Sequence, residues 1–274
     1  MHYYAIDLES FVFSGAQKYT RLCSEERKRI DGGTVVRHTE QVLELLRSHR
    51  TKLSFFIVGE INDWYPDLVD SISREGHEIC YHTHNHTYLR EPGMIASELE
   101  QSRDFLARYR IKGFQAPAII FHKEDYKFLA KSGFQYSASV YSSAEPYKMD
   151  GVLEIPVSTS PRKPGIIPVD YPARMSLGML TREVPFGSSF LLKCMGWRKI
   201  SSYIKLCETS GRSANLFIHN WQLFKEPAAA RRDRFMENLR NPISIPYSFN
   251  VLEEFQCLLK EHQFGRMDEA LKRI

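Results

Sequence analysis

The segment GHEICYHTHNH, residues 76–86, holds four of the ten histidines of the chain. Two of them, His82 and His86, follow an apolar run that has the composition of a β-strand. If a turn of helix begins there, both imidazoles lie on one side and could bind a single metal ion, as spaced histidine pairs do in zinc sites. His84 would point elsewhere in that geometry. Half-exposed histidines at strand ends are also common, so a metal site requires ligands from a second segment.

Two carboxylates stand at the end of the first apolar run, YYAIDL, at residues 3–8. Asp7 and Glu9 are two positions apart, so in extended backbone both side chains project to the same side. Burying two carboxylates is costly unless a positive charge lies close to them. A divalent cation held by Glu9, His82 and His86 would supply that charge and leave Asp7 beside it as a base. The alternative is that Asp7 caps a helix and Glu9 is a solvated acid.

A third strand end carries His219, in the segment LFIHNW. An imidazole titrates close to neutral pH, so His219 could serve as a general acid if it faces the same opening. A histidine among apolar residues is also common as a structural residue with satisfied hydrogen bonds. The strand-end position favours the first interpretation, because active sites of barrel folds lie at the carboxyl ends of parallel strands.

Apolar runs that alternate with amphipathic segments would position these side chains. Strands are predicted at residues 3–8, 53–59, 77–82, 111–117, 134–140, 151–158 and 214–221, and helices at residues 39–49, 65–76, 94–108, 125–133 and 250–261. About seven such units indicate an α/β fold with a mainly parallel sheet, and they favour a (β/α) barrel over an open sheet. In a barrel, the three strand ends would face one mouth.

Residues 157–198 break this alternation. They are rich in proline, glycine and aromatic residues without a clean period, which predicts loops, short strands or an insertion over one barrel face. No internal repeat or linker divides the chain, so residues 1–274 are expected to form a single catalytic domain.

Composition and charge narrow the functional classes. Lysine and arginine together number 37 against 33 acidic residues, and this mild, evenly spread excess argues against a nucleic-acid or membrane-surface partner. The amino terminus lacks a basic and apolar leader and no apolar stretch reaches membrane length, so a cytoplasmic protein without a membrane span is expected. The five cysteines are scattered and form no CxxC pair, which predicts reduced thiols.

Taken in order, several segments resemble the motifs of the polysaccharide deacetylases, carbohydrate esterase family four, also called the NodB-homology domain. These segments are IDLE, LSFFIVGE, GHEICYHTHNH, GFQAP, FLAKSGFQYSASV, LEIPVS and LFIHNW, and the resemblance extends from about Tyr3 to about Gln263. It implies a distorted, incomplete barrel. It also implies a hydrolase that removes acetyl groups from amino sugars or glycans with a divalent metal, commonly zinc, with cobalt or manganese as alternatives.

The resemblance implies roles for the side chains at the three strand ends. Asp7 matches the catalytic base and His219 the catalytic acid. Glu9, His82 and His86 match the metal ligands. The implied reaction is hydrolysis in which the cation activates water, Asp7 accepts the proton of that water and His219 protonates the departing amine.

Other residues are implied to contact the substrate. The backbone N–H of Ala118, after Pro117, matches a donor to the oxyanion, and Leu216 matches a wall of the acetyl pocket. Trp221 is expected either to line the pocket or stack on a sugar ring, or to be buried as core. The partner is an amino sugar or glycan, and the sequence leaves the oligomeric state open.

The chain departs from the family pattern at two positions. Gln115 stands where the family has an arginine that pairs with the catalytic aspartate, and a neutral amide cannot supply that charge. Arg162, Lys163 or Arg174, in the irregular segment, could replace it. Glu9 stands in place of the more usual aspartate, which lengthens the ligand by one methylene.

Three functions are compatible with these residues. The first is a deacetylase of an amino sugar or glycan precursor, in surface polysaccharide biosynthesis. The second is a hydrolase of the same fold that acts on a non-sugar C–N bond, as amidase-like and allantoinase-like relatives do. The third is a barrel that binds glycan without turnover, which Gln115 would explain. An amidohydrolase reading of His82 and His84 as an HxH pair is disfavoured, because that motif usually ends the first strand of its barrel.

Overall fold

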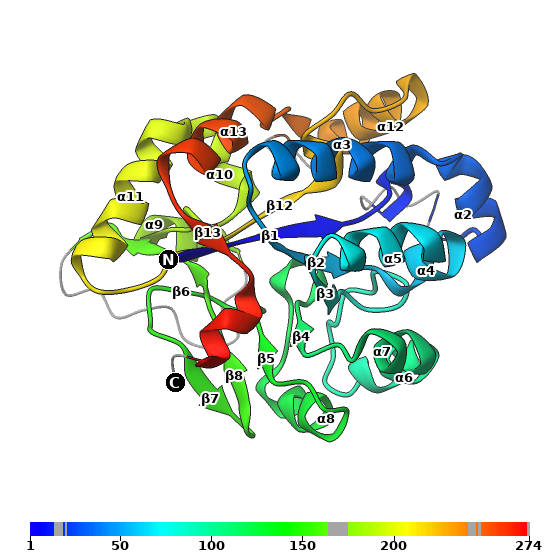
Figure 1. The fold of residues 1–274 in the computed structure, drawn as a ribbon, viewed down its shortest axis with the longest axis horizontal. Coiled ribbons are helices and arrows are strands. Elements are labelled where there is room, and N and C mark those ends of the chain that lie inside the picture. The colour runs from blue at the N-terminus through cyan, green and yellow to red at the C-terminus, as the bar shows by residue number, and fades with distance from the viewer. Residues whose placement is uncertain (14–18, 20, 164–174, 241–244, 246–247, 273–274) are drawn as a thin grey trace.

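The main sheet curls into a distorted, incomplete barrel (Figure 1). The structure, a computed structural model, describes residues 1–13, 19, 21–163, 175–240, 245 and 248–272. The strands of the main sheet are β1 (His2–Leu8), β2 (Ser54–Ile57), β3 (Glu78–Tyr81), β4 (Gly113–Phe114), β5 (Tyr136–Ser137), β7 (Tyr147–Met149), β8 (Val152–Glu154), β12 (Asn215–His219) and β13 (Phe264–Gly265).

The order of these strands is that of a barrel. Among the described residues it is β12-β1-β2-β3-β4-β5-β8-β7, with β13 paired to the start of β1. Neighbours from β12 to β8 are all parallel, whereas β7 is antiparallel to β8. The run from β12 to β8 contains seven strands, which confirms the predicted fold class.

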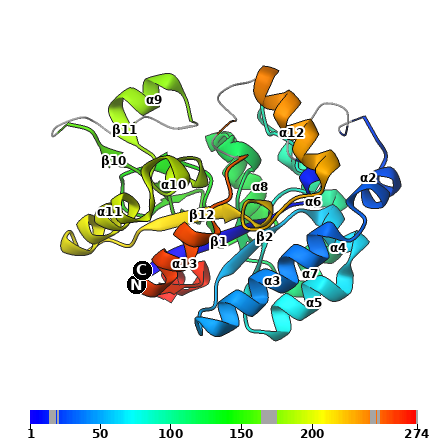
Figure 2. The ribbon, with the colours of Figure 1, turned by 90° about the horizontal axis from the view of Figure 1, so that it is seen from above.

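Helices surround the outer face of the sheet (Figures 1 and 2). The α-helices are α2 (Ser24–Asp31), α3 (Thr34–Ser48), α4 (Gly59–Trp64), α5 (Pro66–Arg74), α6 (Ile95–Gln101), α7 (Arg103–Tyr109), α8 (Tyr126–Lys131), α9 (Leu177–Arg182), α10 (Ser189–Met195), α11 (Trp197–Thr209), α12 (Ala228–Arg240) and α13 (Leu252–Glu261). None of the helices in the described part of the chain combines the length and the apolar character needed to cross a membrane.

The alternation of side chains along β1 separates two apolar clusters. Tyr4 and Ile6 belong to the larger cluster, which the helices cover, whereas Tyr3 and Ala5 belong to a smaller one on the other face of the sheet. Asp7 continues the second series, so its side chain points to the inner face at the end of the strand. The first strand thus delivers a buried carboxylate to the barrel mouth.

The predicted irregular segment closes the gap between β8 and β12. The short strand β9 (Val157–Ser158) and the turn at Gly187 lie there, and the Gly187 amide donates to the Ser158 carbonyl at 2.9 Å. The Phe217 amide of β12 in turn donates to the Gly187 carbonyl at 2.9 Å. A Cβ on Gly187 would lie 2.4 Å from the Asn215 carbonyl oxygen, so this close approach requires glycine. The seam itself is made of loop and short strand, as predicted, but the rest of the segment also contains the helices α9 and α10, which were not predicted. Residues 164–174 lie outside the described residues.

Several elements differ from the sequence expectations. The helix predicted at residues 94–108 is two helices, α6 and α7, that meet at Ser102, whose ψ of 11° departs from the α-helical value. Strands β4 and β5 keep only two residues each, because pairing ends where the loops of the barrel mouth begin. Six helices of the described residues were not predicted: α2, α4, α9, α10, α11 and α12. In α2, charged residues leave no apolar period to detect.

Candidate active site

The carboxyl ends of β1, β3 and β12 meet at one mouth of the barrel, toward which the β1 arrow points in Figure 1. Asp7 on β1 is the register partner of His219 on β12. His82 follows β3 directly, and its amide donates to the Ile57 carbonyl of β2 at 3.0 Å. The three strand ends singled out from the sequence therefore converge.

Glu9, His82 and His86 form the centre of this mouth. The Glu9 Oε1 atom lies 3.2 Å from His82 Nε2 and 3.0 Å from His86 Nε2. One ligand atom from each of the three residues lies within 4.8 Å of the others, and the Glu9 and His82 side chains are buried. The predicted ligand triad is thus brought together.

A main-chain carbonyl orients His82. The His82 Nδ1 atom lies 2.8 Å from the Gln115 carbonyl oxygen, which can only accept a hydrogen bond. Nδ1 therefore carries a proton, and Nε2, which faces Glu9, is the ring nitrogen placed to bind a metal ion. Metal-binding histidines are commonly held in this way by a carbonyl behind the ring.

The backbone between His82 and His86 is not the turn of helix expected from their spacing. Thr83 and His86 have φ of 60° and 56°, in the left-handed region. This irregular loop, and not a helix, turns the two imidazoles toward Glu9, so the predicted geometry was wrong although the predicted convergence is observed. Non-glycine residues in this region cost on the order of 1 kcal/mol each and concentrate at functional sites.

His84 points away from this centre, as expected. Its Nδ1 atom lies 3.0 Å from the Ser102 hydroxyl, and its amide donates to Glu98 Oε2 at 2.7 Å. Ser102, at the break between α6 and α7, therefore helps to hold the loop that carries His82 and His86, the two predicted metal ligands.

The two carboxylates of the mouth have opposite electrostatic surroundings. Burial raises the pKa of Asp7 well above its usual range, and the charge of Glu9 raises it further. Burial alone would also raise the pKa of Glu9, but His86, His219 and His82 outweigh it and hold that pKa well below its usual range. Glu9 is therefore the ionised member of the pair.

The residues present fit a divalent metal ion. Two neutral imidazoles and a carboxylate are a common donor set of catalytic zinc, and Glu9 is held ionised among them. Asp7 Oδ1 is buried and has no hydrogen-bond partner among the described residues. A cation beside Glu9 would offset the charge that opposes ionisation of Asp7.

His219 is oriented by Gln222, a residue that the sequence analysis missed. Gln222 Oε1 accepts from the His219 amide at 3.2 Å and lies 2.8 Å from His219 Nδ1. The His219 Nε2 atom then faces the mouth, 3.9 Å from Asp7 Oδ2 and 3.8 Å from Glu9 Oε1. Burial lowers the pKa of His219, although Glu9 opposes the shift. The i, i+3 spacing of histidine and glutamine was the available sequence signal.

Trp221 is buried against Glu9 and His219. It is 6% exposed, its Nε1–H donates to Glu9 Oε2 at 3.2 Å, and its ring stacks on that of His219 with centroids 4.6 Å apart. Arg234, on α12, lies over the other face of the indole at 4.0 Å. Of the two alternatives expected for Trp221, burial is the one observed, and stacking on a sugar ring is not available because both faces of the indole are already occupied.

The GFQAP segment forms a strained turn at the rim. Pro117 is buried, whereas Ala118 is exposed and has a φ of 55°. Gln115 is buried, and its Oε1 atom has no hydrogen-bond partner among the described residues. The exposed position of Ala118 is compatible with the predicted oxyanion donor, and the side chain of Gln115 is not engaged by an ion pair.

Among the described residues, no cation proposed to replace the family arginine lies beside Asp7. The Arg162 guanidinium is exposed and donates to the Leu180 carbonyl at 2.6 Å. Lys163 is also exposed, and Arg174 lies outside the described residues. Replacement by Arg162 is therefore wrong, since its guanidinium is committed elsewhere.

Leu216 also differs from its expected role. It belongs to the larger apolar cluster on the helix-covered face of the sheet and is 2% exposed. His219 is three residues further along β12, so strand alternation places these two side chains on opposite faces. Leu216 therefore packs the core and does not wall an acetyl pocket.

A buried acid behind the mouth, Glu154 on β8, was not expected from the sequence. Its carboxylate accepts from the Ser139 amide at 2.8 Å, the Val140 amide at 3.1 Å and the Tyr126 hydroxyl at 2.6 Å. Ser139 Oγ accepts from the Ala116 amide at 2.9 Å. Glu154 thus braces the turn that presents the rim residues, and burial raises its pKa to about 7.

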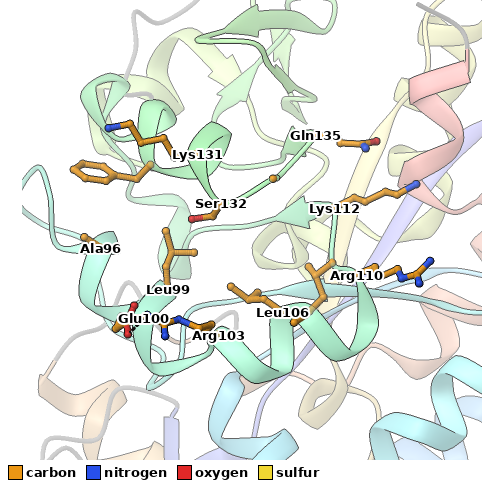
Figure 3. Close-up of a pocket in the computed structure, with 14 residues that line it drawn as sticks. Ala96, Leu99, Glu100, Arg103, Leu106, Arg110, Lys112, Lys131, Ser132 and Gln135 are labelled. Carbon is orange, nitrogen blue, oxygen red and sulfur yellow. Dashed lines mark hydrogen bonds and ion pairs between the residues drawn. The ribbon is translucent and has the colours of Figure 1, made fainter.

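A separate hollow of about 630 Å³ lies on the outer surface, between α6, α7 and α8 (Figure 3). Leu99 and Leu106 point into it, and Arg110, Lys112 and Lys131 lie around its edge. Lys112 precedes β4, so the hollow lies toward the amino ends of the strands, opposite the mouth. It is not part of the candidate active site.

The match to known families covers the middle of the chain. Residues 30–136 match the family model described as polysaccharide deacetylase. This segment belongs to the polysaccharide deacetylase family. It contains His82 and His86 but neither Glu9 nor His219, so the association of all three strand ends comes from the structure.

Two curated polysaccharide deacetylases illustrate the extent of the likeness. A peptidoglycan-N-acetylglucosamine deacetylase of Bacillus cereus is 30% identical over 82 residues, which are 30% of this chain and 29% of that protein. A chitooligosaccharide deacetylase of a Bradyrhizobium species is 29% identical over 114 residues, 39% of this chain and 51% of the relative. The chain thus spans less than a third of the first relative and about half of the second.

The fold is shared more widely than the sequence. The crystal structure of a putative polysaccharide deacetylase from Mycobacterium smegmatis superposes with a TM-score of 0.55 at 15% identity. The superposition covers 100% of this chain and 90% of the other. At this identity the likeness establishes the barrel fold of the polysaccharide deacetylases for the whole chain.

Proposed function

We propose that this chain is a metal-dependent hydrolase that removes the acetyl group from an N-acetylated amino sugar, in a glycan or a glycan precursor. The observation that carries the proposal is the placement of Glu9, His82 and His86 beside the Asp7–His219 pair. The names of the related proteins support the acetamido sugar as the substrate class. A cytoplasmic location and a role in surface polysaccharide biosynthesis remain predictions.

Glu9, His82 and His86 would hold the metal, which when bound supplies Lewis-acid activation of water and of the acetyl carbonyl. Asp7 is the general base, since its raised pKa makes its carboxylate a strong proton acceptor once it is ionised. His219 protonates the departing amine through Nε2, which faces the mouth because Gln222 holds Nδ1.

The rim of the mouth would complete the reaction site. The exposed amide of Ala118 donates a hydrogen bond to the oxygen on which charge develops during attack. Trp221 keeps Glu9 and His219 in place, through one hydrogen bond and one stacked ring face. The residues of this chain thus supply a base, an acid and an oxyanion donor around one centre.

The proposal is tested by acetate release from N-acetylated chitooligosaccharides by the purified protein, with metal content measured in parallel. We expect bound zinc, cobalt or manganese, and acetate release that is lost in His82→Ala. The matched control is His49→Ala at the end of α3, far along the chain from the mouth, which should retain both properties. Metal-free protein that releases acetate as fast as the metal-loaded protein would contradict the proposal.

A second candidate, glycan binding without turnover, is favoured by one observation. Gln115 is neutral and its Oε1 atom is unpartnered, so no cation replaces the family arginine beside Asp7 among the described residues. This function predicts metal and glycan binding with no acetate release. Restored acetate release in Gln115→Arg would then identify the missing charge as the cause.

A further inference from the structure

Helix α12 packs against the barrel by its polar side. The Tyr19 hydroxyl donates to the Asp233 carboxylate, and Arg234 donates to Glu226 at 3.0 and 2.5 Å. Arg234 also covers the indole of Trp221. Surface helices normally bury an apolar stripe and expose a polar one. In α12, Asp233 and Arg234 point inward.

The apolar residues of α12 point outward. Phe235, Met236 and Leu239 are 60%, 45% and 62% exposed. The described residues contain eight exposed large apolar side chains, and five of them lie in the stretch 235–249, including Ile245 and Phe249. Scattered single apolar residues are normal on a surface, but a contiguous group marks an interaction site.

Cations border this apolar group. Arg231 and Arg232 precede Phe235 by one turn of helix and are exposed. Glu226 and Asp233, two acids close by in the chain, are both engaged on the inner side. We call Arg231, Arg232, Phe235, Met236 and Leu239 the docking face. It combines exposed apolar side chains with a local positive charge that the even overall composition does not reveal.

The docking face lies beside the candidate active site. Arg234, on the inner side of α12, contacts Trp221, which hydrogen-bonds Glu9. Figure 2 shows α12 as an outlying helix at the edge of the molecule, on the side toward which the strands of the barrel run. A surface bound to the docking face would therefore lie close to the mouth.

We propose that the docking face binds an anionic lipid surface, and that the N-acetylated glycan is carried on a lipid in that surface. The second part rests on the proposed function. Helices with exposed phenylalanine and leucine beside arginine lie in the interface of bilayers, with the apolar side chains among the acyl chains. Arginine near the surface of an anionic leaflet adds electrostatic attraction.

Other occupants fit the docking face less well. A free glycan chain offers hydroxyl groups, which Met236 and Leu239 cannot hydrogen-bond. A symmetric contact between two copies would bring Arg231 and Arg232 of both chains to one interface, where like charges repel. A lipid surface is apolar inside and anionic outside, which matches the composition of the docking face.

The lipid proposal is tested by co-sedimentation with vesicles of phosphatidylcholine alone and of phosphatidylcholine mixed with phosphatidylglycerol. We expect the intact chain to bind the mixed vesicles. The double variant Phe235→Ser/Leu239→Ser should bind them with an affinity at least about tenfold lower. The matched control is Leu206→Ser on α11, which removes another exposed apolar side chain, 50% exposed, and should bind as the intact chain does. Arg231→Gln/Arg232→Gln should lose the preference for anionic vesicles.

Three outcomes overturn the lipid proposal. The first is failure of the intact chain to bind either kind of vesicle, and the second is unchanged binding by the Phe235→Ser/Leu239→Ser variant. The third is a dimer of the intact chain and a monomer of the variant in light scattering, when the intact chain binds no vesicles. The last result would assign the docking face to a second copy of the chain.

Kinetics separate the substrate proposal from the proposed function. Acetate release from a soluble chitooligosaccharide tests the function alone, and Phe235→Ser/Leu239→Ser should leave its rate unchanged. For an N-acetylglucosaminyl lipid in anionic vesicles, the same variant should raise KM about tenfold and leave kcat unchanged. An equal KM for intact chain and variant on the vesicle-borne sugar would overturn the substrate proposal, whereas absence of acetate from the soluble substrate would overturn the function.

Discussion

Glu9 and Glu154 are both buried carboxylates near the barrel mouth, yet their surroundings act in opposite directions. Three histidines surround Glu9 and hold its pKa low, whereas neutral hydroxyl and amide donors surround Glu154 and burial raises its pKa to about 7. Hydrogen bonds from neutral groups satisfy a carboxylate without offsetting the cost of its burial. Burial alone therefore does not identify a reactive acid, because the groups that surround the carboxylate decide whether it is ionised.

The largest expected effect follows from replacing the first of these acids. Glu9→Gln removes the negative charge among the three histidines, and we expect acetate release to fall on the order of a thousandfold because the metal is lost. Glu154→Gln is the matched control, since it makes the same change at the other buried acid. It should retain bound metal, measured by elemental analysis. Equal metal loss in both variants would remove the distinction between the two acids.

A smaller loss of rate is expected on replacing His219, the proposed general acid, which faces Glu9. His219→Ala should lower kcat on the order of a hundredfold, because the departing amine then lacks a proton donor. Since His219 is not one of the three predicted ligands, the metal content of this variant should equal that of the intact chain. Joint loss of metal and activity would instead make His219 a ligand.

The raised pKa of Glu154, the second of the two buried carboxylates, should make the free energy of unfolding depend on pH. The pKa of Glu154 in the folded protein is raised from its ordinary 4.5 to about 7. Protonated Glu154 therefore contributes to the free energy of unfolding in full below pH 4.5, and this contribution is lost as the pH rises through 7. This shift amounts to about 3 kcal/mol of unfolding free energy. Urea unfolding of the intact chain and of Glu154→Gln at pH 5 and pH 8 measures it. A pH dependence that is the same in both proteins would show that Glu154 is ionised at no cost.

The smallest effect is expected at the hydrogen bond that supports Glu9. Trp221→Phe keeps a ring against His219 but removes the N–H donor to Glu9, and we expect about tenfold weaker metal binding. Trp197→Phe, at the start of α11, is the control and should bind metal as the intact chain does. Titration with a fluorescent zinc chelator as competitor measures both affinities. Unchanged affinity would limit Trp221 to packing.

Apolar runs were sufficient to predict the barrel, because fully buried parallel strands such as β1 and β2 have few other readings. The site was predictable for a related reason. Parallel strands place their carboxyl ends at one mouth, so Asp7, His82 and His219 had to come near each other once the strands were assigned.

Local geometry was less accessible to sequence reasoning. The left-handed backbone at Thr83 and His86 has no glycine to signal it, so the histidine spacing suggested a helix that does not form. Leu216 was misassigned because a motif was followed where strand alternation already placed its side chain opposite His219. Helix α12 was missed because its sequence, AAARRDRFMENLR, is rich in charged residues and has only a weak apolar period.

The contact between His82 and the Gln115 carbonyl separates two properties of the same position. The carbonyl that orients the imidazole belongs to the main chain and is present whatever amino acid occupies position 115. A glutamine at position 115, in place of the family arginine, changes the charge next to Asp7, whereas His82 keeps the same tautomer. If Glu9, His82 and His86 hold a metal ion as proposed, the main chain at position 115 would support metal binding and the side chain would set the charge beside Asp7. Turnover would then be lost by a change of side chain that leaves metal binding intact.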